Sequence, residues 1–456
     1  MDQLDRLNGW QASLAKQTKE IRKIVDGFVD EMSFVEKDAF TCGKSRLDGE
    51  PIYGEGVLTG TATVSGSEIV IIAQNAAALG GSFGAASARK ILAALTLAAR
   101  NNLPLLAILD STGARVGEGV EMLEGYGAVL KGIADLSRQV LTIAYIRGQA
   151  SGVTRMFAGL CTYQIAKEEA TVSVNAPFVA TAKYSLGKDA LLGKSAAKAG
   201  SVDFVVRDDR QAASLLLNLL GHTYGERDTE DDPNREAPFL TVDSPAEDWI
   251  AAILDDEAYT EFQAECAPAI KCVLGTVNGG PVALAVCDPK EGKTLNAAAL
   301  SKLARFVVIN GASGIPFISL VNCEGLEDKD QNALALATSD YLWQLSRGDF
   351  GKIAVVLNAF GSAYATLASK GVGFEYSVGV AQGKVGVLSP SAGIHLVYQD
   401  LLHAKGNTPQ VQAELEELYA KQNCDVLEAA KAGYLDEVID PATIRPYIAN
   451  ALILVG

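Results

Sequence analysis

The chain of 456 residues carries one sequence pattern twice. In each half, an apolar strand, a loop and a helical segment lead to a proline that opens a second apolar strand. The proline is Pro104 in the first copy and Pro316 in the second, and a glycine turn follows each strand. Strands that alternate with helices at this spacing are typical of stacked β–α–β units. The repeat therefore predicts two homologous α/β domains in tandem.

A charged, proline-containing stretch with few apolar residues separates the two copies, which is typical of a linker. We expect this linker over residues 223–244, a first domain over 32–222 and a second over 245–456. Residues 1–31 are predicted to form an amphipathic helix because their leucines and isoleucines recur near helical spacing.

The composition excludes several classes of partner. A net charge of −16 disfavours duplex DNA and anionic membranes, which attract surplus lysine and arginine. The acidic N-terminus does not resemble a signal peptide, and the apolar stretch 91–99 is about half the length of a bilayer span. Seven scattered cysteines indicate reduced thiols rather than a disulfide framework. We predict a cytoplasmic protein without nucleic-acid partners or membrane insertion.

Side chains for metal or histidine chemistry are scarce. The three histidines, His222, His395 and His403, have no second ligand at metal-site spacing, and no C-x-x-C sequence occurs. We expect no metal in this chain.

Two sequences resemble nucleophile or phosphate motifs without meeting their requirements. Residues 80–84 satisfy G-x-S-x-G, but residues 75–79 separate the serine from the preceding strand, whereas a hydrolase nucleophile directly follows its strand. Residues 187–195 resemble a P-loop, but their glycines are six positions apart instead of five. We therefore predict neither a hydrolase nor an ATP-binding protein.

With these side-chain motifs excluded, the remaining candidate for chemistry is the backbone of the glycine-rich turns that follow apolar strands. Such a turn directs free N–H groups, supported by a helix dipole, at one point, where they can stabilise an oxyanion. Alternatively, the small residues only let helices pack closely on strands. The turns contain Gly80-Gly81, Gly113, Ser151-Gly152 and Gly361-Ser362-Ala363.

Three motifs in order resemble one family. Residues 110–120, D-S-T-G-A-R-V-G-E-G-V, resemble the D-S-G-G-A-R-I-x-E-G-V stretch of the beta-type carboxyltransferase subunits of biotin-dependent acyl-CoA carboxylases and decarboxylases. Residues 80–84 resemble the G-G-S-x-G of that family, and residues 358–364 resemble its K-A-Y-G-G-A-Y. The similarity extends over about residues 35–400.

The resemblance implies a crotonase-like (ClpP/crotonase) fold in two tandem domains, of which the first binds an acyl-CoA and the second binds biotin. Its members move a carboxyl group between biotin and the α-carbon of the acyl-CoA. An A-M-K-M biotin-attachment sequence is absent, so biotin would be carried by a biotinyl carrier protein. A biotin carboxylase or decarboxylase subunits are further expected partners, and the chain would form a homo-oligomer, either a dimer or a hexamer.

The resemblance also implies the site residues. Ser151 and Gly152 match the oxyanion hole of the first domain, and Ser362 and Ala363 match that of the second. Arg89 and Lys90 would contact a CoA phosphate. The full set expected to bind substrate comprises Gly80, Gly81, Ser82, Arg89, Lys90, Thr112, Gly113, Ala114, Arg115, Gly361 and Tyr364.

The chain departs from the family where glycine pairs become Thr112-Gly113, Ser151-Gly152 and Gly361-Ser362. The basic residues that usually precede A-Y-G-G are Leu357-Asn358, and Ala365 replaces an aspartate that helps to select the acyl group. The acyl substrate and the direction of transfer therefore stay open. Two alternatives also stay open: a biotin-independent, malonate decarboxylase-like carboxyltransferase and a non-catalytic scaffold of such a complex.

Overall fold

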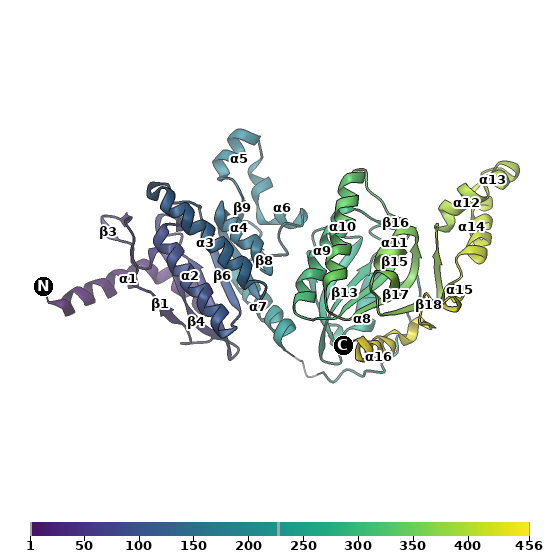
Figure 1. Ribbon diagram of the computed structural model, residues 1–456, viewed down its shortest axis with the longest axis horizontal. Coiled ribbons are helices and arrows are strands. Elements are labelled where there is room, and N and C mark those ends of the chain that lie inside the picture. Colours follow the sequence, from purple (N-terminus) through teal and green to yellow (C-terminus); the bar gives the residue numbers. More distant parts are fainter. Residues whose placement is uncertain (1, 226–228, 456) are drawn as a thin grey trace. The chain divides into compact units, whose positions relative to one another are not determined.

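A computed structural model describes residues 2–225 and 229–455 (Figure 1). The chain divides into two compact units, Met1–Leu220 and Gly221–Gly456. Helix α7 (Asp209–Tyr224) ends inside the predicted linker, and residues 226–228 of that linker lie outside the described residues. Among the described residues, no helix combines the length and the apolar character needed to cross a bilayer.

The first unit is built on an eight-stranded sheet. Its order is β1-β4-β5-β6-β7-β8-β10, with β9 paired to β7; β1, β4 and β5 are antiparallel and the later pairs are parallel. The strands are β1 Val35–Lys37, β2 Arg46–Leu47, β3 Glu50–Pro51, β4 Val57–Val64, β5 Ser67–Gln74, β6 Leu105–Ser111, β7 Thr142–Ser151, β8 Tyr163–Lys167, β9 Thr171–Ser173 and β10 Phe204–Val206. The remaining helices are α1 Gln3–Asp26, α2 Ala85–Asn101, α3 Val120–Leu136, α4 Val153–Leu160, α5 Pro177–Tyr184 and α6 Gly193–Lys198.

The second unit repeats this arrangement in a seven-stranded sheet of order β11-β12-β13-β15-β17-β18-β19. The strands are β11 Thr260–Phe262, β12 Ile270–Val277, β13 Gly280–Cys287, β14 Thr294–Leu295, β15 Phe317–Cys323, β16 Gly325–Leu326, β17 Lys352–Phe360, β18 Tyr376–Gly386 and β19 Glu437–Ile439. The helices are α8 Ala246–Ile253, α9 Ala297–Ala312, α10 Gln331–Arg347, α11 Gly361–Leu367, α12 Pro390–Val397, α13 Gln399–Lys405, α14 Pro409–Asn423, α15 Val426–Lys431 and α16 Ile444–Val455.

The two sheets correspond strand by strand. In both units two antiparallel strands precede a helix, and a parallel strand, a second helix and another parallel strand follow. Within each unit the two helices, α2 and α3 or α9 and α10, pack against each other (Figure 1). The predicted pair of homologous α/β halves is confirmed.

The central strands are covered on both faces, which explains their continuous apolar sequences. In β17, the side chains of Ile353, Val355 and Leu357 join a core that also contains Trp249 of α8 and Ile448 of α16. Alternate residues of a strand point to the opposite face, which α9 covers in the second unit, with α10 packed against α9.

Each unit contains a buried lysine at the sixth position of the helix that follows its antiparallel strands. Lys90 Nζ of α2 donates to the carbonyl oxygen of Val57, the first residue of β4, at 2.7 Å. Lys302 Nζ of α9 donates to the carbonyl oxygen of Ile270, the first residue of β12, at 2.9 Å, and to that of Cys266 at 3.0 Å. The two units thus share a buried lysine with equivalent hydrogen bonds, in addition to the same order of strands.

A buried arginine secures the C-terminal helix of the second unit. The Arg445 side chain of α16 is fully buried and donates to Asp255 Oδ1 at 2.6 Å and to the carbonyl oxygen of Ile253 at 2.8 Å. These bonds join α16 to the end of α8.

Candidate functional site

In the first unit, two of the predicted motifs form one paired structure. Backbone N–H groups of Thr112 and Phe83 donate to the carbonyl oxygens of Gly80 and Gly113 at 3.0 and 2.8 Å. Arg115 N–H donates to the carbonyl oxygen of Phe83 at 2.9 Å, and Phe83 and Ala114 form a parallel bridge. The structure therefore brings together the loops that the sequence analysis selected separately.

Glycine is required where these loops meet. Gly81 has φ +65°, and a Cβ built there would lie 2.0 Å from the carbonyl oxygen of Asp110. Gly113 has φ +102°, which L side chains rarely adopt. Thr112 lies against Gly80, where a Cβ would come within 3.0 Å of the threonine methyl carbon. Close backbone approach therefore explains the glycines without a ligand.

The Arg115 side chain holds this structure together. It is 6% exposed, donates to the carbonyl oxygen of Ser82 at 2.7 Å and to Ser82 Oγ at 3.3 Å, and forms a buried ion pair with Glu55. Glu118 pairs with Arg115 and accepts the N–H of Ala85 at 2.7 Å. Arg115 and Ser82 were expected to bind substrate; in the structure their polar groups are engaged in fixing the loop and the first turn of α2.

The expected oxyanion donors of the first unit are also engaged. Ser151 is buried, and its Oγ accepts from Gln149 Nε2 at 2.8 Å. The N–H of Gly152 donates to the carbonyl oxygen of Val174 at 3.0 Å. Helix α4 begins at Val153, and the N–H groups in the first turn of a helix have no intrahelical partner. The Val153 and Thr154 N–H groups therefore lack an intrahelical partner, whereas the Gly152 N–H is bonded to Val174.

The equivalent turn of the second unit begins at Gly361, which opens α11 with φ +50°, compared with +60° at Gly152. Each glycine follows the third parallel strand of its sheet, β7 or β17. Ser362 and Ala363 therefore correspond to Val153 and Thr154, so the two predicted pairs, Ser151-Gly152 and Ser362-Ala363, differ in position by two residues.

Of the two residues predicted to contact a phosphate, one is exposed and the other is buried. Arg89 is exposed on α2, whereas Lys90 is 2% exposed and its ammonium group points inward. Burial lowers the pKa of Lys90, opposed by Glu36 at 3.6 Å. The expected phosphate contact of Lys90 is therefore wrong. Tyr364 of α11 is half-buried, and this burial raises its pKa.

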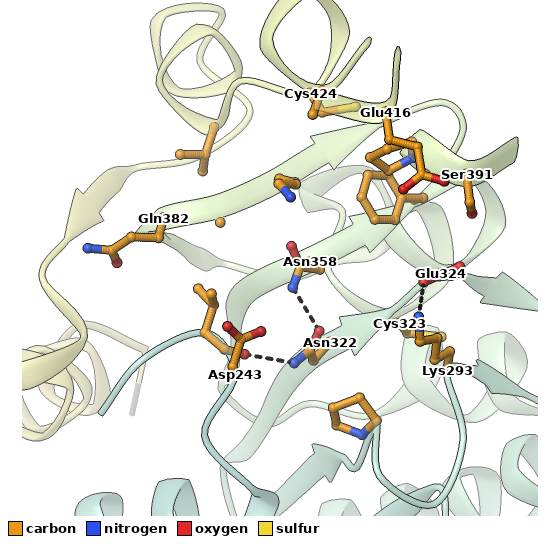
Figure 2. Close-up of a pocket in the computed structure, with 18 of the residues that line it drawn as sticks. Asp243, Lys293, Asn322, Cys323, Glu324, Asn358, Gln382, Ser391, Glu416 and Cys424 are labelled. Carbon is orange, nitrogen blue, oxygen red and sulfur yellow. Dashed lines mark hydrogen bonds and ion pairs between the residues drawn. The ribbon is translucent and has the colours of Figure 1, made fainter. Parts of the chain in front are cut away.

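The second unit contains a cavity of about 960 Å³ that the sequence analysis did not predict (Figure 2). Its floor consists of the last residues of β15 and β17, and its walls come from the β13–β14 loop, from β18 and from helices α12, α14 and α15. Phe360, directly before the Gly361 turn, belongs to the lining. The cavity therefore adjoins the second predicted oxyanion turn.

Charges of both signs line this cavity. Lys293 Nζ lies 3.3 Å from Glu324 Oε1. The cationic side chains are Lys290, Lys293, Lys384 and Lys421. The anionic side chains are Asp243, Glu324, Glu416, Glu417 and Asp425. This near balance differs from the concentrated positive charge that a nucleotide phosphate requires. Within the described residues, no cluster of three or more His, Cys, Asp or Glu has a metal-binding arrangement.

A chain of two side-chain amides forms part of the cavity floor (Figure 2). Asn322 Nδ2 donates to the carbonyl oxygen of Val242 at 3.1 Å, and Asn358 Nδ2 donates to Asn322 Oδ1 at 3.0 Å. A polar residue directly after each buried apolar run was the available sequence signal for this pair.

The comparisons with known proteins agree with this architecture. The carboxyl transferase domain family matches residues 13–455. The chain is 26% identical to the propionyl-CoA carboxylase beta chain of Saccharopolyspora erythraea, over 96% of this chain and 88% of that protein. It is 27% identical to the methylmalonyl-CoA carboxyltransferase 12S subunit of Propionibacterium freudenreichii subsp. shermanii, over 97% and 89%.

A crystal structure of a hexameric transcarboxylase 12S with methylmalonyl-CoA bound has a TM-score of 0.89 and 24% identity, over 99% of this chain and 94% of that one. This likeness confirms the crotonase-like fold. Carboxyl transfer, the activity that the motifs predicted, is confirmed, and the two alternatives are not favoured. The chain belongs to the carboxyl transferase domain family.

Proposed function

We propose that this protein is the carboxyltransferase subunit of a biotin-dependent acyl-CoA carboxylase or decarboxylase. It moves a carboxyl group between biotin, attached to a carrier protein, and the α-carbon of an acyl-CoA thioester. The observation that carries the proposal is the pair of equivalent strand-to-helix turns at Gly152 and Gly361, one in each unit of a carboxyl transferase chain. The names of the similar proteins support an acyl-CoA substrate.

In the first unit, the Val153 and Thr154 N–H groups are positioned to receive the thioester oxygen when negative charge develops on it. The positive φ of Gly152 turns the chain into α4 so that these groups precede the helix. Each such donor lowers a barrier by roughly 3–4 kcal/mol in other enzymes. Arg115 contributes by fixing the adjoining loop.

In the second unit, the Ser362 and Ala363 N–H groups and the adjoining cavity would hold the ureido ring of biotin. When bound, biotin supplies the nitrogen that carries the carboxyl group. The ring is uncharged, and the balanced lining of the cavity suits an uncharged ligand. The anionic CoA is therefore assigned to the first unit, where Arg89 is exposed.

The partners proposed from this function are a biotinyl carrier protein and a biotin carboxylase or decarboxylase subunits. We also propose a homo-oligomer, for which the hexameric transcarboxylase 12S is the precedent, and a cytoplasmic location.

The proposal is tested by incubating the purified protein with free biotin and, separately, malonyl-, methylmalonyl- and glutaconyl-CoA, with mass-spectrometric detection of the decarboxylated thioester. Biotin-dependent loss of CO₂ from one thioester is expected and would identify the acyl group. Loss without biotin would support a malonate decarboxylase-like enzyme instead. CoA binding without loss from any thioester would support a scaffold.

A further inference from the structure

The orientation of the two amides in the cavity floor is determined by a backbone group. The carbonyl oxygen of Val242 can only accept a hydrogen bond, so the Asn322 nitrogen faces it at 3.1 Å. The Asn322 oxygen therefore faces Asn358, whose nitrogen donates to it at 3.0 Å. This leaves Asn358 Oδ1 at the free end of the two hydrogen-bonded amides, directed away from Asn322 (Figure 2).

Two irregularities in the sheet place this oxygen on the cavity floor. The register between β15 and β17 shifts after Val321, so that Asn322 lies opposite Asn358 instead of Leu357. On the other side of β17, residues 380–383 of β18 are left outside the register, and three of them line the cavity. Gly383 permits this close packing, because a Cβ there would lie 2.5 Å from the carbonyl oxygen of Leu357.

An acceptor held in this way binds an N–H donor. A carboxylate at the same place would also attract cations, but an amide oxygen is neutral at every physiological pH. Asn322 is 8% exposed and Asn358 is half-buried, so the two amides are partly shielded from water. Away from water, a hydrogen bond discriminates strongly between donors and acceptors because an unsatisfied polar group is costly.

We propose that Asn358 Oδ1 accepts an N–H of a ureido ring bound in this cavity and that Asn322 is the positioning residue that keeps Asn358 in this orientation. The inference rests on the proposed function, which brings the ureido ring of biotin to the second unit. It adds the residue that selects the ring and the direction of the hydrogen bond.

The first experiment measures binding of biotin methyl ester, an uncharged probe that keeps the ureido ring, by ligand-detected NMR titration of the full chain. Asn358→Ala is expected to weaken binding about five- to tenfold, the usual value of a neutral hydrogen bond. Asn322→Ala should weaken it by roughly threefold because the acceptor loses its orientation. Asn332→Ala is the matched control and should leave binding unchanged, since Asn332 is an exposed amide on α10 outside the lining of this cavity.

The second experiment uses Asn358→Asp and separates ligand binding from a structural role. A protonated carboxyl group reproduces the donor and acceptor pattern of the amide, because its O–H can donate to Asn322 Oδ1. A carboxylate places an acceptor against that oxygen instead. Binding to this variant should be weak at about pH 8 and recover toward the wild-type value at about pH 5, because burial and the opposed acceptor raise the pKa of such an aspartate. Wild-type binding, measured beside it, corrects for titration of the cavity lysines and carboxylates named above.

The outcomes separate the two proposals. Unchanged binding in Asn358→Ala, no pH response in Asn358→Asp, or no binding of the probe to the wild type would overturn the inference. If the wild type still shows biotin-dependent loss of CO₂ in that case, the proposed function stands without it. If the wild type binds the probe through Asn358 but no thioester loses CO₂ with biotin, the proposed function fails and the ureido site remains.

Discussion

Asp110 and Asn322 occupy the same position in the two units, one residue before the end of β6 and of β15. Asp110 Oδ1 accepts the backbone N–H of Gln149 at 3.1 Å, whereas Asn322 bonds to a second side chain that faces a cavity. Burial raises the pKa of Asp110, opposed by the Gln149 N–H and by Arg147. One scaffold thus holds an ionisable group in one half and a neutral amide at the matching position of the other.

The two units also differ in which segments their buried arginines join. Arg115 fixes the loops of the candidate site in the first unit, whereas Arg445 joins helices α8 and α16 of the second. The first site therefore depends on an ion pair within its own loops.

The largest effect is expected from breaking these ion pairs. Arg115→Ala leaves Glu55 buried without its partner and should lower the free energy of unfolding of the first unit by about 3–5 kcal/mol. Arg445→Ala should cost the second unit a similar amount through Asp255. Calorimetry of both variants checks this, with Arg89→Ala as the exposed control. Equal stability of Arg115→Ala and Arg89→Ala would show that the ion pair between Arg115 and Glu55 does not stabilise the first unit.

A smaller effect is expected from two glycines that occupy equivalent positions after β6 and β15. Gly113→Ala forces a side chain to φ +102° and should destabilise the first unit by about 1–3 kcal/mol. Gly325 lacks a positive φ and a Cβ there meets nothing within 4 Å, so Gly325→Ala should stay within about 0.5 kcal/mol of the wild type. Urea denaturation compares the two, and equal losses would contradict the assigned loop geometry.

The smallest effect concerns Asp110→Asn, which gives the first unit the residue of the second. The folded-state pKa of Asp110 is raised, so its favourable contribution to stability is present below the unfolded pKa and is lost as pH rises through the folded pKa. The variant should therefore melt slightly above the wild type at neutral pH, and the difference should vanish in acid, below both pKa values. A melting difference that is independent of pH would show that burial of the carboxylate is not its cause.

Much of the fold was predictable because proline and glycine mark the ends of buried apolar strands such as 105–111 and 317–323. The site was predictable only as a set of turns. Whether Gly152 N–H is available depends on Val174, which follows a separate strand, β9. Whether Arg89 or Lys90 faces solvent depends on the phase of one helix. The cavity depends on bulges and on helices α12, α14 and α15, which carry no motif.

The matching lysines, Lys90 and Lys302, also make the two halves separately observable. An amine-directed acylating reagent reacts with a lysine only when its Nζ reaches water, and both groups are bonded to backbone carbonyls beneath their helices. Each becomes labelled only when its own half opens. Peptide mapping after timed labelling would therefore record the opening of each half separately in the intact chain, with or without substrates.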